Sequence, residues 1–153
     1  MATIETNQRV EALRESPAAR PGAVGRRRPR PRILVVEDHD ETREVVAMLL
    51  KTEGYDVVLA SDGDAGVAAA RASRPQIAII DIFLPRKDGV AVIQELVRDL
   101  PSIVIIAVSA DASEDRHGAL IRARAAGAHF TLRKPLEPWV LLKALEGVTG
   151  ASA

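Results

Sequence analysis

The feature that most constrains the fold of this chain is a repeat of short apolar runs that alternate with helix-forming segments. The runs at 33–36, 77–80 and 103–108 are unbroken stretches of Ile, Leu, Val and Ala. Such runs are typical of strands buried on both faces of a parallel sheet, whereas half-exposed strands alternate apolar and polar residues. The repeat therefore predicts an α/β fold.

Two weaker strands are expected at 55–60 and 129–133, which gives five strands in all. The segments between strands predict helices, because they carry apolar residues at helical spacing and end near Gly or Pro. Asp40 and Asp62 are the expected N-caps of the first two helices. Right-handed crossovers would then cover both faces of a parallel sheet. The expected helices are 40–53, 62–74, 89–100, 113–126 and 137–148.

Composition excludes several classes of protein. The chain has no Cys, so disulfides, thiolate catalysis and Cys-based zinc sites are ruled out. Its apolar runs are far shorter than the roughly 20 residues that a membrane helix needs. The N-terminal sequence MATIETNQRV lacks the basic-then-apolar order of a secretory signal. We expect a cytoplasmic protein with no membrane contact.

The formal net charge of zero hides a basic leader ahead of an acidic domain. Residues 1–32 hold eight Arg against three Glu, and the remainder holds 13 basic against 18 acidic residues. Prolines and repelling charges at 26–32 predict a disordered leader, either a solvated tail or an electrostatic arm for nucleic acid or an acidic partner. We favour the solvated tail. The expected division is a leader at 1–32, a domain at 33–148 and a tail at 149–153.

Candidate functional residues directly follow four of the expected strands. Glu37 and Asp38 follow the first strand, and Asp81 follows the third. Ser109 follows the fourth strand, and Lys134 follows the fifth. Ligands of open α/β sheets bind at the carboxyl ends of the strands. We therefore expect these side chains to meet at one edge of the sheet.

This set of groups suits phosphoryl transfer. Carboxylates are the ligands that Mg²⁺ prefers, and three acids without a cation would force one of them to take up a proton. An Asp carboxylate can attack phosphorus to form an acyl phosphate. An ammonium and a hydroxyl can hold the other phosphoryl oxygens. Each residue alone is an ordinary turn or cap residue, so the prediction depends on their joint presence.

Four segments resemble the signatures of receiver domains of two-component response regulators. They are Ile33–Asp38, Ile80–Gly89, Val108–Ala110 and Leu132–Pro135. The resemblance covers about 33–148 and is closest in kind to single-domain, chemotaxis-like regulators. It implies a flavodoxin-like, doubly wound, five-stranded parallel sheet of order 2-1-3-4-5 with five helices.

The resemblance also implies a role for each residue at the strand ends. Asp81 would be the phosphoacceptor, Ser109 and Lys134 would hold the phosphoryl group, and Pro135 would follow a cis peptide bond. The cofactor would be Mg²⁺. Its ligands would be Asp38, Asp81, the backbone carbonyl of Phe83, and Glu37 either directly or through water.

The implied function is that of a stand-alone response regulator. It would accept a phosphoryl group from a sensor histidine kinase or phosphotransfer protein, catalyse its own dephosphorylation, and signal by binding an unidentified protein. A conventional enzyme is not expected. Two alternatives stay open: a phosphorylation-independent adaptor, and a regulator whose Arg-rich leader binds nucleic acid. The apolar residues of the last helix region are expected to form either a homodimer interface or part of the core. They are Leu136, Val140, Leu141 and Leu145.

The sequence departs from the family pattern on the expected output face, which is the surface around the fourth helix, fifth strand and fifth helix. Thr131 occupies the place of the usual switch aromatic, and Phe130 should face the other side of the sheet by strand alternation. The span 109–134 is longer than usual by about one helical turn. The extra residues are expected near 116–126, where they could change the shape of the output face.

A further departure lies beside the expected phosphoacceptor. Phe83 is bulky and follows Asp81 by two positions, and Asp111 lies two past Ser109. We expect slow self-dephosphorylation, because the Phe83 ring could shield the acyl phosphate from water. The histidines are interpreted as residues without a chemical role: His39, His117 and His129.

Overall fold

Five parallel strands form one sheet in the order β2-β1-β3-β4-β5. The computed structural model describes residues 30–110 and 116–150. The predicted α/β class and the order 2-1-3-4-5 are confirmed, and every strand lies within one residue of its expected bounds. The strands are β1 (Arg32–Val36), β2 (Asp56–Ala60), β3 (Ile77–Asp81), β4 (Val104–Ser109) and β5 (Phe130–Arg133).

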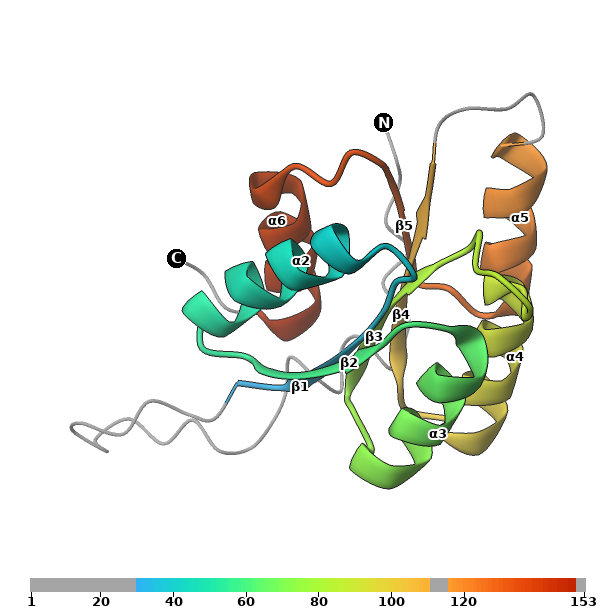
Figure 1. Cartoon of the computed structure of the whole chain (residues 1–153), viewed down its shortest axis with the longest axis horizontal. Helices are drawn as coiled ribbons and strands as arrows, with labels where there is room; N and C mark the ends of the chain where they lie inside the picture. Colours follow the sequence, from blue (N-terminus) through green and yellow to red (C-terminus); the bar gives the residue numbers. More distant parts are fainter. Residues whose placement is uncertain (1–29, 111–115, 151–153) are drawn as a thin grey trace.

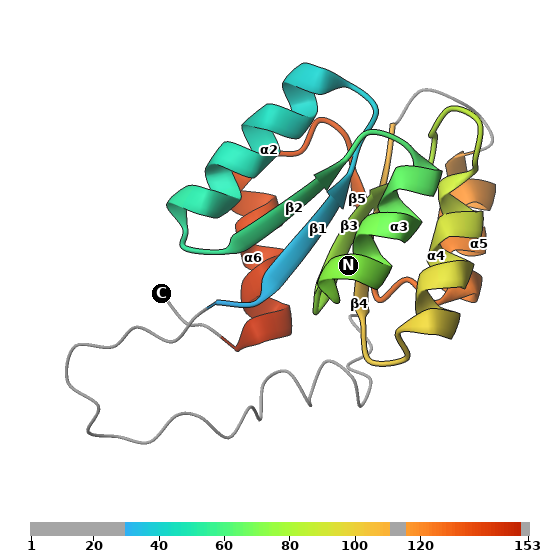
Figure 2. The same cartoon turned by 60° about the horizontal axis from the view of Figure 1, so that its bottom comes forward.

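Helices cover both faces of this sheet. Two of them lie on one face and three on the other, which is the doubly wound arrangement (Figure 1, Figure 2). None of the described helices is long and apolar enough to cross a membrane. The first face carries α2 (Asp40–Thr52) and α6 (Pro138–Thr149), and the second carries α3 (Gly63–Ser73), α4 (Gly89–Asp99) and α5 (Arg116–Ala126).

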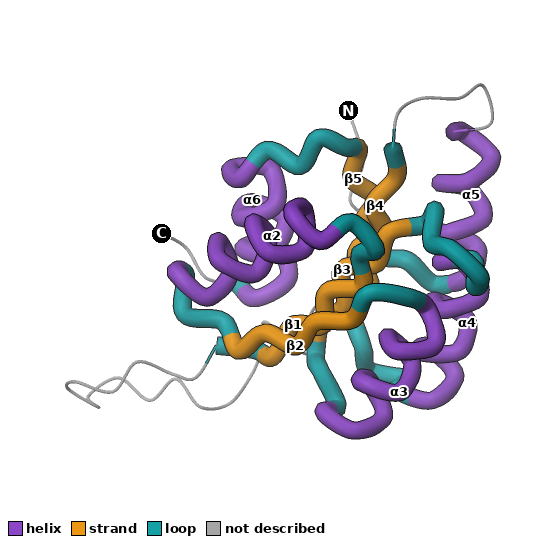
Figure 3. The backbone as a smooth tube through the Cα atoms, viewed as in Figure 1, coloured by secondary structure: helices purple, strands orange, loops and turns teal. Residues whose placement is uncertain are grey.

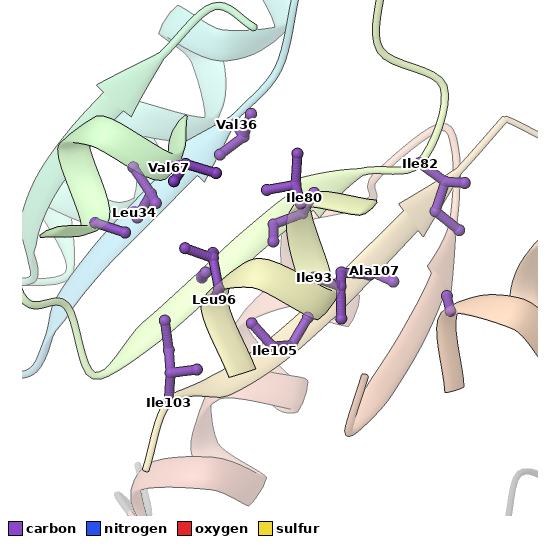
Figure 4. Packing of buried hydrophobic residues seen from close by; sticks show 14 of the residues in the cluster. Leu34, Val36, Val67, Ile80, Ile82, Ile93, Leu96, Ile103, Ile105 and Ala107 are labelled. Atoms are coloured by element: carbon purple, nitrogen blue, oxygen red, sulfur yellow. The ribbon is translucent and has the colours of Figure 1, made fainter. Parts of the chain in front are cut away.

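Two apolar layers hold the helices to the sheet. Successive residues of β1 point to opposite faces, so Ile33 and Val35 join the layer under α2 and α6. Leu34 and Val36 join the layer under α3, α4 and α5, which Figure 4 shows together with Leu96 of α4. Each fully buried Leu or Ile stabilises the fold by about 1.5–3 kcal/mol. The central strands are therefore rigid supports for the residues at their ends.

The N-cap of α2 differs from the prediction. His39, and not Asp40, has the extended backbone of a cap residue, and its Nδ1 accepts the N–H of Thr42 at 3.3 Å. Asp40 is the first helical residue, where it pairs with Arg43 and where a negative charge favours the helix dipole. The expected cap of α3, Asp62, is confirmed.

Strand β5 places its aromatic residue away from α5. Phe130 is buried in the layer under α2 and α6, as the alternation predicts. Thr131 lies beside Ala107, which belongs to the opposite layer. Leu141 and Leu145 of α6 are buried in the same layer as Phe130, so both contribute to the core.

Some expectations fall outside the described residues. Residues 1–29 hold most of the expected basic leader, and 151–153 hold most of the expected tail. The expected helix start at Ser113 and the acid Asp111 also lie outside the described part.

His129 extends the pairing of β4 and β5 with its side chain. Its N–H donates to the carbonyl of Ile105 at 2.8 Å, and the N–H of Ile105 donates to its Nδ1 at 3.0 Å. The imidazole ring thus accepts the hydrogen bond that the backbone carbonyl of a further β5 residue would otherwise accept. His129 has a structural role that the sequence did not reveal.

We predict that His129→Ala lowers the free energy of unfolding by about 1–3 kcal/mol, because the buried N–H of Ile105 loses its acceptor. His129→Asn keeps a short side-chain acceptor and should recover most of this loss. Urea unfolding of the three proteins measures the difference. Equal losses in both variants would contradict the hydrogen-bond explanation.

Candidate functional site

The carboxyl ends of β1, β3 and β5 bring three charged side chains into contact. The Nζ atom of Lys134 lies 2.7 Å from Oδ2 of Asp81 and 2.9 and 3.0 Å from the two carboxylate oxygens of Glu37. Lys134 is 53 positions from Asp81 and 97 from Glu37 along the chain. The sheet topology, and not local sequence, therefore assembles this contact.

Both carboxylates are almost completely removed from solvent. Glu37 and Asp81 are each 5% exposed, and the Lys134 side chain is 24% exposed. Burying a charge is costly unless the charge is paired. One ammonium serves two carboxylates, so the pairing leaves an excess of negative charge.

The pKa values reflect this excess. Burial, followed by the neighbouring Asp81, raises the pKa of Glu37 to about 7, although Lys134 opposes the shift. Burial lowers the pKa of Lys134, but its hydrogen bonds with Asp81 and Glu37 outweigh burial, so the net shift is upward. Lys134 stays charged, while Glu37 holds a proton readily near neutral pH.

Asp38 completes an acidic cluster with these two carboxylates. Glu37, Asp38 and Asp81 each offer an oxygen, and the three oxygens lie within 4.8 Å of one another. Asp38 is exposed, which leaves room for the waters that Mg²⁺ retains. An all-oxygen set with a charge excess fits a hard divalent cation better than it fits a soft transition metal. The residues present therefore fit Mg²⁺.

Ser109 and Phe83 lie at the ends of β4 and β3. Ser109 is 1% exposed, and its Oγ donates to the carbonyl of Ala110 at 3.2 Å. The backbone N–H of Phe83 donates to Oδ1 of Asp81 at 2.9 Å, while the residue itself is 49% exposed. Of the predicted site residues, the carboxylates and Lys134 are thus in one cluster, whereas the Ser109 hydroxyl is directed at a neighbouring carbonyl.

Lys134 is positioned by the pairing of β5 with β4. Its N–H donates to the carbonyl of Ser109 at 2.8 Å. The Lys134–Pro135 peptide bond is cis, as the resemblance implies.

Gly89 supports the site; the sequence placed it at the end of the signature segment Ile80–Gly89 but assigned it no such role. Its N–H donates to the carbonyl of Ile82 at 3.0 Å. A Cβ atom at this position would lie 2.3 Å from the carbonyl oxygen of Asp81. Only Gly allows α4 to begin so close to the backbone that follows Asp81. The Asp-Gly pair at 88–89 was the available signal in the sequence.

Comparison with known proteins identifies relatives over most of the chain. The family model for the response regulator receiver domain matches residues 33–146. The chain is 30% identical to Protein PilH of Pseudomonas aeruginosa over 120 residues, which cover 76% of this chain and 96% of PilH. It is 36% identical over 124 residues to the probable transcriptional regulatory protein TcrX of Mycobacterium tuberculosis, covering 78% of this chain and 51% of TcrX. The chain spans about half the length of several such regulators.

Solved structures give the same result. A CheY-like receiver domain protein from Methanospirillum hungatei has a TM-score of 0.71 at 28% identity, covering 76% of this chain and 90% of that chain. The receiver domain of sensor histidine kinase PA1611 from Pseudomonas aeruginosa has a TM-score of 0.69 at 30% identity, covering 79% of this chain and 98% of that chain. That structure holds a magnesium ion coordinated in its active-site cleft.

We predict that Mg²⁺ binds about tenfold more tightly at pH 8 than at pH 6, because the cation must displace a proton from Glu37, whose pKa is about 7. Calorimetric titration at the two pH values measures this ratio. Glu37→Gln should bind Mg²⁺ more weakly and with little dependence on pH. Equal affinities of the wild-type protein at both pH values would contradict the prediction.

The same shift has a consequence for stability without a divalent cation. The folded pKa of Glu37 exceeds its ordinary value of 4.5, so the folded state binds the proton more tightly than the unfolded state does. The contribution of Glu37 to the free energy of unfolding therefore falls as pH rises from 4.5 through about 7. Added Mg²⁺ should offset this loss at pH 8.

Proposed function

This chain belongs to the response regulator receiver family, and from that premise we propose that it accepts a phosphoryl group on Asp81 from a histidine kinase or phosphotransfer protein. The observation that carries the proposal is the contact of Lys134 with a buried Asp81 inside an acidic cluster. A structural ion pair would need neither a second buried acid nor the exposed Asp38. The arrangement suits a carboxylate that becomes more highly charged during its reaction.

In the proposed reaction, a carboxylate oxygen of Asp81 attacks the phosphorus of a phosphohistidine. The new bond from oxygen to phosphorus forms as the bond from phosphorus to the imidazole nitrogen breaks, and the imidazole leaves with a proton from solvent. The N–H of Phe83 holds Oδ1 of Asp81. This hydrogen bond orients the carboxylate and leaves the other oxygen facing Lys134.

We propose that Glu37, Asp38, Asp81 and the backbone carbonyl of Phe83 hold Mg²⁺. When bound, Mg²⁺ would neutralise charge on the transferring phosphoryl group. The Lys134 ammonium, which contacts both Glu37 and Asp81, would then pair with a phosphoryl oxygen. Ser109 would do the same after its hydroxyl turns away from the carbonyl of Ala110.

The biological role proposed for this chemistry is signalling by a stand-alone receiver domain in the cytoplasm. Support comes from PilH, which the match covers almost from end to end. Phosphorylation of Asp81 would shift the domain between two states that differ in their affinity for a downstream protein. The proposed division remains a basic leader at 1–32, the receiver domain at 33–148 and a tail at 149–153. The complete acidic cluster disfavours an adaptor that works without phosphorylation.

We predict that acetyl phosphate and Mg²⁺ add one phosphoryl group to the wild-type protein and none to Asp81→Asn, because the amide is not a nucleophile. Intact-mass spectrometry detects the addition. Asp99→Asn is the matched control, because this acid lies at the end of α4 and pairs with Arg71. Absence of added mass on folded wild-type protein would falsify the proposed function.

We predict that phosphorylated wild-type protein loses its phosphoryl group over minutes or longer, and that Phe83→Ala shortens this half-life. The backbone N–H of Phe83 contacts Asp81, and we propose that the apolar ring two positions past the phosphoacceptor restricts the approach of water. Phe83→Leu keeps apolar bulk and should behave more like the wild type. A wild-type half-life of seconds, or an unchanged half-life in Phe83→Ala, would contradict the shielding role.

A further inference from the structure

Lys87 connects the loop between β3 and α4 to two helices. This loop begins directly after Asp81 and ends at the start of α4 (teal in Figure 3). The Nζ atom of Lys87 contacts the carboxylate of Glu95 in α4 and lies 3.5 Å from Oδ1 of Asp64 in α3. One side chain thus reaches from the loop to both neighbouring helices.

The fold makes room for the stem of this lysine. A Cβ atom at Gly63, the first residue of α3, would lie 2.9 Å from Cβ of Lys87 and 2.9 Å from Cγ2 of Val92. Any larger residue at Gly63 would therefore displace the Lys87 stem or α4. The Lys87 side chain is only 22% exposed. Its position is thus set by packing as well as by charge.

The ion pair with Glu95 is the stronger of the two contacts. Glu95 is 27% exposed, whereas Asp64 is 77% exposed and more fully screened by water. The hydrogen bond with Glu95 raises the pKa of Lys87, so the charge persists at any ordinary assay pH. The loop is consequently attached to α4 by a charged pair that solvent only partly reaches.

Lys87 lies near the α4 end of a loop that backbone N–H groups fasten at both ends, and its side chain adds a further contact. At one end Phe83 donates to Asp81, and at the other Gly89 donates to the carbonyl of Ile82. Between them Arg86 adopts a left-handed backbone (φ 67°), which is strained for a non-Gly residue. A contact that keeps this strained turn in place also fixes the backbone of the residues before it.

We propose that Lys87 is a positioning residue of the phosphorylation site: by joining the loop to Glu95 it holds the backbone at Phe83 where Asp81 and a bound cation require it. This inference rests on the proposed function, because it concerns the same site. The Lys87 ammonium contacts Asp64 and Glu95, which lie outside the acidic cluster, so its proposed effect on the site passes through the loop.

The test compares Lys87→Met, which keeps the apolar stem, with Glu95→Gln, which removes the partner without altering the loop. Each should weaken Mg²⁺ binding about fivefold and slow phosphorylation by acetyl phosphate at subsaturating Mg²⁺. Their melting temperatures should fall by less than about 4 °C, because a partly exposed ion pair contributes little to stability. The exchanged pair, Lys87→Glu with Glu95→Lys, should recover much of the affinity. Lys51→Met, on an exposed part of α2, is the charge-matched control.

A purely structural role would lower the melting temperature and leave the Mg²⁺ dissociation constant of the folded protein unchanged. That result in both single variants would overturn the inference. Calorimetric Mg²⁺ titration needs no phosphorylation, so it tests Lys87 separately from the proposed function. Wild-type protein that binds Mg²⁺ but takes up no phosphoryl group would refute the function, whereas unchanged Mg²⁺ binding in both variants would refute only the role of Lys87.

Discussion

The site depends on a single ammonium group shared by two buried carboxylates. Lys134 contacts both Glu37 and Asp81, and the burial of these acids leaves more negative charge than one lysine can compensate. Burial, followed by the neighbouring Asp81, raises the pKa of Glu37, and the excess negative charge gives the cluster its affinity for a further positive charge. A domain that only needed stability would gain more from apolar residues at these positions. The electrostatic cost is therefore best explained by function.

The sequence was sufficient to predict the architecture and the members of the cluster. The unbroken apolar runs of β1, β3 and β4 do not fit strands with one solvent-exposed face. They therefore predicted buried strands and the bounds of those strands directly. Parallel strands align their carboxyl ends, which is why residues as distant as Glu37 and Lys134 could be expected to meet. The family resemblance added the strand order, which the structure confirms, and an expected role for each residue.

Other features could not be predicted, because they depend on contacts between residues far apart or on side-chain geometry. Asp40 is the better N-cap by residue preference, yet the backbone turns one position earlier and His39 takes that role. The acceptor role of His129 requires Ile105 to lie opposite its ring. The reach of Lys87 to both Asp64 and Glu95 depends on how α3, α4 and the loop before α4 pack together. A linear pattern of residues contains none of this information.

The separation of 97 positions between Glu37 and Lys134 has a consequence for biosynthesis. Chains leave the ribosome from the N-terminus at about 5–20 residues per second, so Glu37 and Asp81 emerge seconds before the lysine that holds them together. Until β5 docks beside β4, the acids lack their shared cation and the edge of the sheet is incomplete. A partly synthesised chain therefore lacks the Lys134 contacts of the acidic cluster, which form only when nearly the whole domain has been translated.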